Sequence, residues 1–205
     1  MDLQHTFTEL LLRIGVPSYK IRTRWDELEK AYSQNNRHYH NLSHLEEMRK
    51  SFFDYKSELQ FPDETLYSLY YHDIVYVSTR KDNEQKSAEW AIALLPKEIN
   101  LNKQIIFDLI LATKDHNANG VADANWLIDF DLKILGKDWD DYKMYAEQIR
   151  KEYSFYPDFL YNPGRVKALK HFLEKPHIYQ TTSFQEKFES KARNNIQKEI
   201  ASLQS

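Results

Sequence analysis

Apolar residues recur every three or four positions along most of the chain, which is the spacing of one face of an α-helix. Three stretches show this pattern, and each also places a polar residue on the apolar face. The stretches are Leu66, Leu69, Tyr70, Asp73 and Val77; Ile106, Leu109, Thr113 and His116; and Ala124, Leu127, Ile128, Asp131 and Leu135. The periodicity predicts an all-α protein of eight to ten helices.

Prolines, glycines and turn-forming sequences mark the expected helix boundaries. Two acids, Asp63 and Glu64, follow Pro62 directly, where they suit the positive end of a helix dipole. Further boundaries are expected at Pro17, Pro96, residues 117–120 (NANG), Gly136, residues 162–164 (NPG) and Pro176. No repeat, low-complexity tract or linker indicates a second domain, so residues 1–205 are expected to form a single domain.

Composition narrows the classes of function. Charged residues make up 29% of the chain with a net charge of −3, and they are well mixed, without the basic excess of a dedicated nucleic-acid binder. There is no cysteine, so any metal must be held by histidines and carboxylates. The N-terminal segment does not resemble a secretory signal, and no stretch approaches the roughly 18 apolar residues of a membrane span. We expect a soluble, cytoplasmic protein that does not bind membranes.

The segment RHYHNLSHLEEM, residues 37–48, contains three of the eight histidines and looks like the start of a helix. On a helix His40 and His44, four positions apart, would be offset by about 40° and project from one face. His44 lies on the same apolar helix face as Met48, which should point toward the core. His38 should project to the outside. Taken alone, His40 and His44 are explained equally well as ordinary buried histidines hydrogen-bonded to their neighbours.

The segment YYHDIVY, residues 70–76, places His72 and Asp73 in apolar surroundings inside an expected helix. A buried carboxylate costs several kcal/mol unless a partner or a metal compensates. Neighbouring positions on a helix are about 100° apart, so both residues could touch one metal only if the helix axis passed close to it.

The segment LIDFDLKILG, residues 127–136, carries two further carboxylates. Asp129 and Asp131 would lie about 200° apart on a helix and cannot face the same point. Because Asp131 shares the apolar face, we expect it to point inward and Asp129 to lie at the surface or next to the site.

Two imidazoles and two carboxylates are therefore expected to face inward from three separate segments: His44, His72, Asp73 and Asp131. Each of them alone is more typical of a structural residue. Together they form a ligand set suited to a divalent ion such as Mn²⁺, Fe²⁺, Zn²⁺ or Mg²⁺. The sequence thus predicts a site for one metal ion or two.

The order His, His-Asp, Asp resembles the HD superfamily of metal-dependent phosphohydrolases. The stretch YHNLSH (39–44) is also similar to the Y-H-N-x-x-H segment of cyclic-nucleotide phosphodiesterases, which are relatives of that superfamily. More loosely, the whole chain looks like short bacterial proteins described as predicted HD-superfamily phosphohydrolases. That pattern includes DNEQKSA (82–88), TKDH (113–116), GR (164–165), Glu189, Ala192, Arg193 and Asn195. The resemblance implies one HD-domain-like helical bundle, with a motif core at about residues 37–136 and C-terminal helices that complete it.

The resemblance also implies roles for the histidines and acids of the motif. His44 would bind metal together with His72, Asp73 and Asp131, and His40 would be the general acid. Other HD enzymes carry an R-x-x-H-S-L segment, and aligning RHYHNL (37–42) with it would make His40 the ligand instead. The longer match favours His44 as the ligand. The two alignments exchange the roles of His40 and His44 but place the same residues in the site.

Three more residues are candidates for the pocket, and each has an ordinary structural alternative. Arg165, after Gly164 at an expected helix start, could bind a phosphate group or could be a surface cap or ion pair. His116 could contact substrate or a second metal, or could be a core histidine. Glu84 could be a catalytic residue whose carboxylate activates water, or could belong to a charged turn.

The leading hypothesis is a hydrolase that uses metal-activated water to cleave a phosphate ester or anhydride, of a nucleotide or another small phosphorylated molecule. His40, with an ordinary pKa of about 6.5, would give the proton to the leaving oxygen. Two alternatives remain open, an HD-type di-iron oxygenase and a non-catalytic nucleotide-binding sensor. The oxygenases use several histidines between the His-Asp pair and the last Asp, where this chain has only His116.

Overall fold

The structure, a computed structural model, describes residues 2–118 and 120–204. These residues form ten α-helices and two short 3-10 helices, and no β-strand occurs among them. The expected all-α fold class with eight to ten helices is thereby confirmed. Within the described ranges no helix combines the length and the apolar character needed to cross a membrane.

The chain divides into two compact units, residues 1–130 and 131–205, and the division falls in the last turn of one helix, α7. The first unit contains α1 (Leu3–Arg13), α2 (Ser18–Tyr32), α3 (Leu42–Tyr55), α4 (Pro62–Tyr71), α5 (Asn83–Leu94), α6 (Lys103–Asp115) and most of α7 (Ala122–Leu132), with a 3-10 turn at Lys56–Glu58 after α3. The expected organisation of the chain as a single domain stays a prediction.

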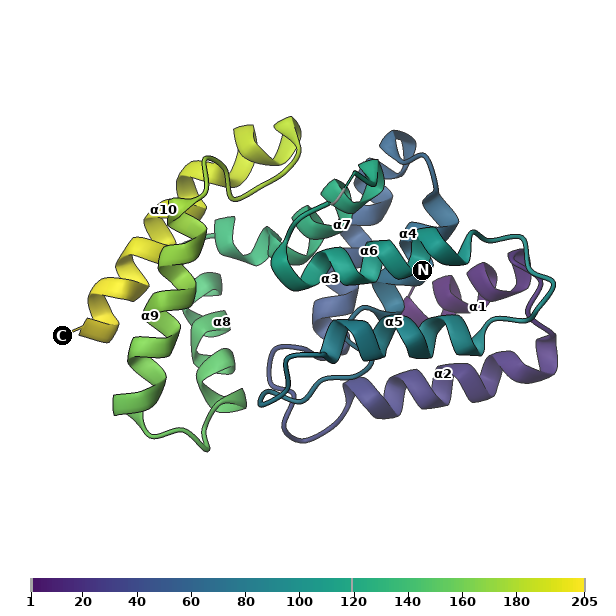
Figure 1. Cartoon of the computed structure of the whole chain (residues 1–205), viewed down its shortest axis with the longest axis horizontal. Helices are drawn as coiled ribbons and strands as arrows, with labels where there is room; N and C mark the ends of the chain where they lie inside the picture. Colours follow the sequence, from purple (N-terminus) through teal and green to yellow (C-terminus); the bar gives the residue numbers. More distant parts are fainter. Residues whose placement is uncertain (1, 119, 205) are drawn as a thin grey trace. The chain divides into compact units, whose positions relative to one another are not determined.

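Helix α4 lies at the centre of the first unit. Residues 65–71 are buried without exception, because α1, α3, α5 and α6 all pack against this helix (Figure 1). The ring of Phe7 from α1 contacts Tyr70 edge-on, with 4.9 Å between the ring centroids. The end of α4 is therefore held from several sides, which matters because His72 follows it directly.

Most predicted boundaries are confirmed, and local chemistry explains them. Helix α2 begins after Pro17, α4 begins at Pro62, and α5 and α9 end just before Pro96 and Pro176. The second 3-10 helix ends at Gly136, and the described residues of 117–120 separate α6 from α7.

Two expectations about helices near the histidines are wrong. Helix α3 begins only at Leu42, because the side chain of Asn41 caps it by accepting a hydrogen bond from the Ser43 N–H at 2.8 Å. His40 therefore lies in the loop before the helix. Helix α4 ends at Tyr71, so Asp73 lies in the turn that follows rather than inside a helix.

The second unit contains the 3-10 helix Lys133–Gly136 and three α-helices, α8 (Trp139–Glu152), α9 (Asp158–Glu174) and α10 (Thr182–Gln204). Helix α10 packs against the other three elements (Figure 1). The boundary expected at residues 162–164 is wrong, since α9 continues through Pro163. Pro163 is the sixth residue of α9, so it removes a single backbone hydrogen bond early in the helix.

A buried charge network joins the three long helices of the second unit. The carboxylate of Glu199 on α10 accepts two hydrogen bonds from Arg165 on α9, at 2.8 and 3.1 Å. The same carboxylate accepts the hydroxyl of Tyr142 on α8 at 2.5 Å. The side chains of Glu199 and Arg165 are only 7% and 12% exposed, so this network lies within the core of the unit.

Three residues of the C-terminal HD-like pattern hold backbone groups of the second unit. The Glu189 carboxylate accepts the N–H groups of Ile178 and Tyr179. Arg193 donates to carbonyls at the end of α9 and beyond it, and Asn195 donates to carbonyls around Gly136. These contacts give the three residues a structural role.

Two glycines of the second unit allow a matched test of its packing. A methyl group at Gly136 would lie 2.6 Å from the Cβ of Phe188 and 2.9 Å from its carbonyl oxygen, whereas one at Gly164 would meet nothing within 4 Å. Gly136→Ala is expected to lower the free energy of unfolding by about 1–3 kcal/mol through overpacking. Gly164→Ala, inside α9, is expected to raise it by about 0.5–1 kcal/mol. Urea unfolding of both variants checks this, and effects of the same sign would contradict it.

Candidate metal centre

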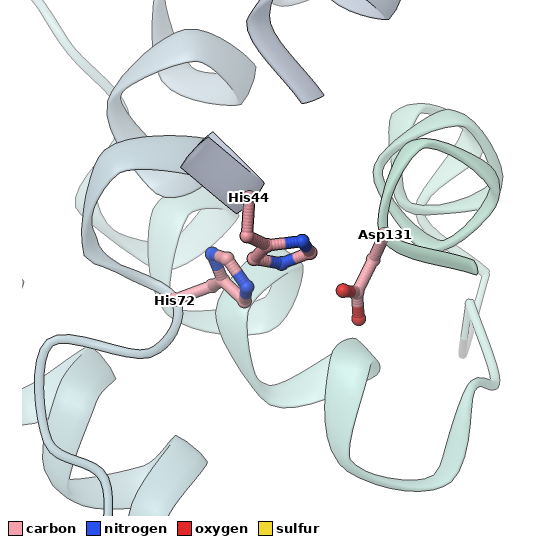
Figure 2. Close-up of side chains that lie close together, drawn as sticks. All are labelled: His44, His72 and Asp131. Atoms are coloured by element: carbon pink, nitrogen blue, oxygen red, sulfur yellow. The ribbon is translucent and has the colours of Figure 1, made fainter. Parts of the chain in front are cut away.

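Three predicted ligands meet in one place. His44, His72 and Asp131 each offer one ligand atom, and these atoms lie within 4.8 Å of one another. Figure 2 shows the Asp131 carboxylate facing the two imidazole rings. His44 and His72 are 5% and 1% exposed, and Asp131 is half-buried. Side chains far apart in the sequence thus converge at a mostly buried point.

The two histidines are positioned by the ends of helices. His44 is the third residue of α3, and its backbone N–H donates to the capping side chain of Asn41 at 3.4 Å. His72 follows the last residue of α4, and its Nδ1 lies 2.9 Å from the carbonyl oxygen of Leu69. With a metal bound at Nε2, a proton on Nδ1 would satisfy that carbonyl.

The third ligand is positioned by the helix that carries it. Near the start of α7 the carboxylate of Asp123 is 1% exposed and accepts the N–H groups of Gln60 and Phe61, at 2.9 and 2.7 Å. These two residues immediately precede α4, so α7 is joined to the beginning of that helix. Because Asp131 continues α7, the preceding turns in the first unit set its position.

Asp73 lies beside the group of three. Its Oδ2 is 3.2 Å from His72 Nε2 and 4.0 Å from His40 Nε2. Burial by itself would raise the pKa of Asp73, but the adjacent His72, with His40 and His44, holds the pKa well below its usual range. Asp73 therefore stays a carboxylate, as a metal ligand must, and its assignment as a ligand stays a prediction.

His40 lies at the edge of the centre. Its ring stacks on Tyr76, with centroids 4.3 Å apart, and its centroid is 6.0 Å from that of His44. The His40 side chain is 20% exposed, whereas His44 and His72 are almost fully enclosed. The His40 imidazole is therefore accessible to solvent next to the buried pair, and its assignment as a general acid stays a prediction.

The other predicted pocket residues differ in their surroundings. Glu84 lies in the first turn of α5, and its pKa is above the ordinary value. Burial is the main cause, and the Asp73 carboxylate raises the pKa further, while a hydrogen bond from the backbone N–H of Glu84 lowers it in part. His116 is half-buried and ends α6 in the left-handed conformation, with φ of 50°. A role in substrate binding or catalysis stays a prediction for both.

For two charged residues the structure corrects part of what was expected. Arg165 lies inside α9 instead of at a helix start, and its guanidinium is bound by Glu199. Its proposed role in phosphate binding stays a prediction. Asp129 was expected at the surface or next to the site. It is 0% exposed, which excludes the surface, and a place next to the site stays a prediction. Residues 127–130 of α7 are all buried, so this turn of the helix has no exposed face on which Asp129 could lie.

Sequence reasoning missed Arg37 and Tyr76, which surround His40. Arg37 is 5% exposed and donates hydrogen bonds to the backbone carbonyls of His40 and Asp73, while Tyr76 stacks on the His40 ring. The available signal was the position of Arg37 within the histidine-rich segment. Its burial depends on contacts with residues more than 30 positions away, which periodicity does not report.

The donor set fits a divalent metal ion. Two imidazole nitrogens and one carboxylate, with a second carboxylate adjacent, match the ligands that Mn²⁺, Fe²⁺ and Zn²⁺ accept, and the carboxylates also suit Mg²⁺. Comparisons of the chain with protein-family models, with curated proteins and with solved structures found no match.

Proposed function

We propose that the chain is a metal-dependent phosphohydrolase that cleaves a phosphate ester or anhydride of a nucleotide or another small phosphorylated molecule. The observation that carries the proposal is the convergence of His44, His72 and Asp131, whose ligand atoms lie within 4.8 Å of one another. The resemblance of the motif order to the HD superfamily supports the choice of phosphoryl chemistry. The same three residues, with Asp73, would hold one divalent ion or two.

A divalent ion at this point would act as a Lewis acid toward a phosphoryl oxygen and would lower the pKa of water. His40 would donate a proton to the leaving oxygen, since its partly exposed ring can reach a bound substrate. Asp73, 4.0 Å from His40 Nε2, would stabilise the protonated form of that ring before transfer. Glu84, whose pKa is raised, would accept the proton of the attacking water.

Replacing Asp73 with alanine tests the proposal. The protein is purified without chelator, its metal content is measured, and phosphate release is assayed with Mn²⁺ across a panel of nucleotides and phosphate esters. We expect close to one or two equivalents of metal in the wild type and loss of phosphate release to background in Asp73→Ala. The loss follows because a carboxylate is removed beside two imidazoles that face the site.

A matched control is Asp26→Ala, which removes an exposed carboxylate paired with Arg22 on α2 and is expected to change neither quantity. Bound metal with no turnover on any substrate would contradict a hydrolase and favour the oxygenase or the sensor. Failure of the wild type to bind metal even after Mn²⁺ is added would contradict the centre itself.

A further inference from the structure

Arg37 joins the two loops that carry the chemistry of the proposed centre. Its Nη1 donates to the carbonyl oxygen of Asp73 at 2.7 Å and to that of His40 at 3.3 Å. Its Nη2 donates to the carbonyl oxygen of Ile74 at 3.0 Å. One buried guanidinium thus holds the main chain of the loop before α3 and of the turn after α4.

Aromatic rings hold the guanidinium in place. Its carbon lies 4.8 Å from the ring centroid of Tyr32 and 5.4 Å from that of Tyr76. The hydroxyl of Tyr32 accepts the backbone N–H of Asp73 at 3.2 Å, and the ring of Tyr76 stacks on His40. Of the two aromatic neighbours of the guanidinium, Tyr32 therefore contacts Asp73 and Tyr76 contacts His40.

We infer that Arg37 is a positioning residue of the proposed metal centre, which sets where His40 and Asp73 stand relative to each other. The inference rests on the proposed function for its chemical meaning, since those two residues are the assigned acid and one assigned ligand. The planar guanidinium can satisfy several carbonyls from two loops at once, whereas a lysine ammonium is a point charge without this fork. A lysine at position 37 would keep the positive charge but could not bind the carbonyls of both loops at once.

The test compares Arg37→Lys with Arg49→Lys. Arg49 is also buried, at 8% exposed, in the same unit, but its guanidinium binds the Glu46 carboxylate and the Thr6 hydroxyl, away from both loops. Three properties are measured for each metal-free protein: the Kd for Mn²⁺ by calorimetry, the NMR signals of the histidine rings, and the thermal unfolding midpoint.

Arg37→Lys is expected to weaken Mn²⁺ binding by about 10- to 100-fold, the range found when residues that orient metal ligands are changed. The ring signals of His40 and His72 should shift, while those of the exposed His5, His171 and His177 should not. Arg49→Lys is expected to lower the unfolding midpoint and to leave the Kd and the His40 signal unchanged. A purely structural role of Arg37 would instead give the two variants the same pattern.

A second variant keeps the test independent of how lysine packs. Arg37→Ala leaves a space beside a hollow of about 340 Å³ that is open to solvent and lined in part by Tyr32, Asn35 and Asn41. Free guanidinium at millimolar concentration is expected to restore part of the Mn²⁺ affinity and the wild-type His40 signal, and methylammonium is expected to restore neither. Equal rescue by both cations would overturn the inference, because the fork would then be unnecessary.

The two proposals fail in different ways. If the wild type binds no Mn²⁺, the proposed function fails, and the positioning role is decided by the histidine signals of the metal-free protein. If the wild type binds Mn²⁺ and Arg37→Lys matches it in Kd and in the His40 signal, the positioning role fails and the metal centre stands.

Discussion

Replacing His44 with glutamine is expected to abolish metal binding and phosphate release together, whereas His40→Gln should keep the metal and slow turnover by about 10²- to 10⁴-fold. The reason is their different positions. His44 belongs to the group of three ligand atoms and is 5% exposed, while the His40 side chain is 20% exposed and lies outside that group. Metal content after dialysis and kcat on a substrate that the wild type hydrolyses measure the two effects separately.

His38→Gln is the control from the same segment. His38 is half-buried, and its backbone carbonyl, which accepts the side-chain amide of Asn41, is unaffected by the substitution. Metal content and kcat should both stay at wild-type values. The opposite pattern, with the metal lost in His40→Gln and retained in His44→Gln, would exchange the two roles and contradict the assignment while leaving the hydrolase in place.

Glu199→Ala is expected to lower the free energy of unfolding by about 3–5 kcal/mol, because it leaves the buried guanidinium of Arg165 without its carboxylate. The pair is almost enclosed, with side chains 7% and 12% exposed, and both oxygens of Glu199 accept a hydrogen bond from Arg165. Burial and the adjacent Glu199 carboxylate hold the pKa of Tyr142 far above its usual range, so its hydroxyl stays a donor. Urea unfolding followed by circular dichroism measures the loss.

Two further variants separate the charge from the packing. Tyr142→Phe removes one hydrogen bond from the network, so it should cost only about 1–3 kcal/mol. The double variant Arg165→Met with Glu199→Leu removes both charges and should recover most of the loss. A cost below about 1 kcal/mol for Glu199→Ala would mean that water reaches the pair, as it does in surface ion pairs.

The fold class could be predicted because helical periodicity and proline act locally. Pro17 and Pro62 mark helix starts in the sequence and in the structure alike. The end of α4 could not be predicted in the same way. Beyond Tyr71 the backbone of Asp73 is bound by Tyr32 and Arg37, which lie 41 and 36 positions earlier, and no local pattern reports such contacts.

Three of the four predicted metal ligands lie together in the structure. His44, His72 and Asp131 come together although His72 lies at a helix end and not inside a helix, since its side chain needs only to be buried at the right place. The position of Asp129 could not be predicted, because residues 127–130 are all buried and this turn of α7 has no outer face. The pairing of Arg165 with Glu199, 34 positions away, is equally invisible to local patterns.

The junction of Asp123 with the beginning of α4 restricts where the chain can change in length. Asp131 lies eight positions after Asp123 along α7, about 12 Å at 1.5 Å per residue. One inserted residue in that interval would turn the second carboxylate by about 100° and carry it away from both imidazoles. The connection 95–102, between α5 and α6, lies outside this interval and can lengthen without altering that spacing. Insertions and deletions in homologous chains should therefore collect in such connections and avoid the interval between the two aspartates.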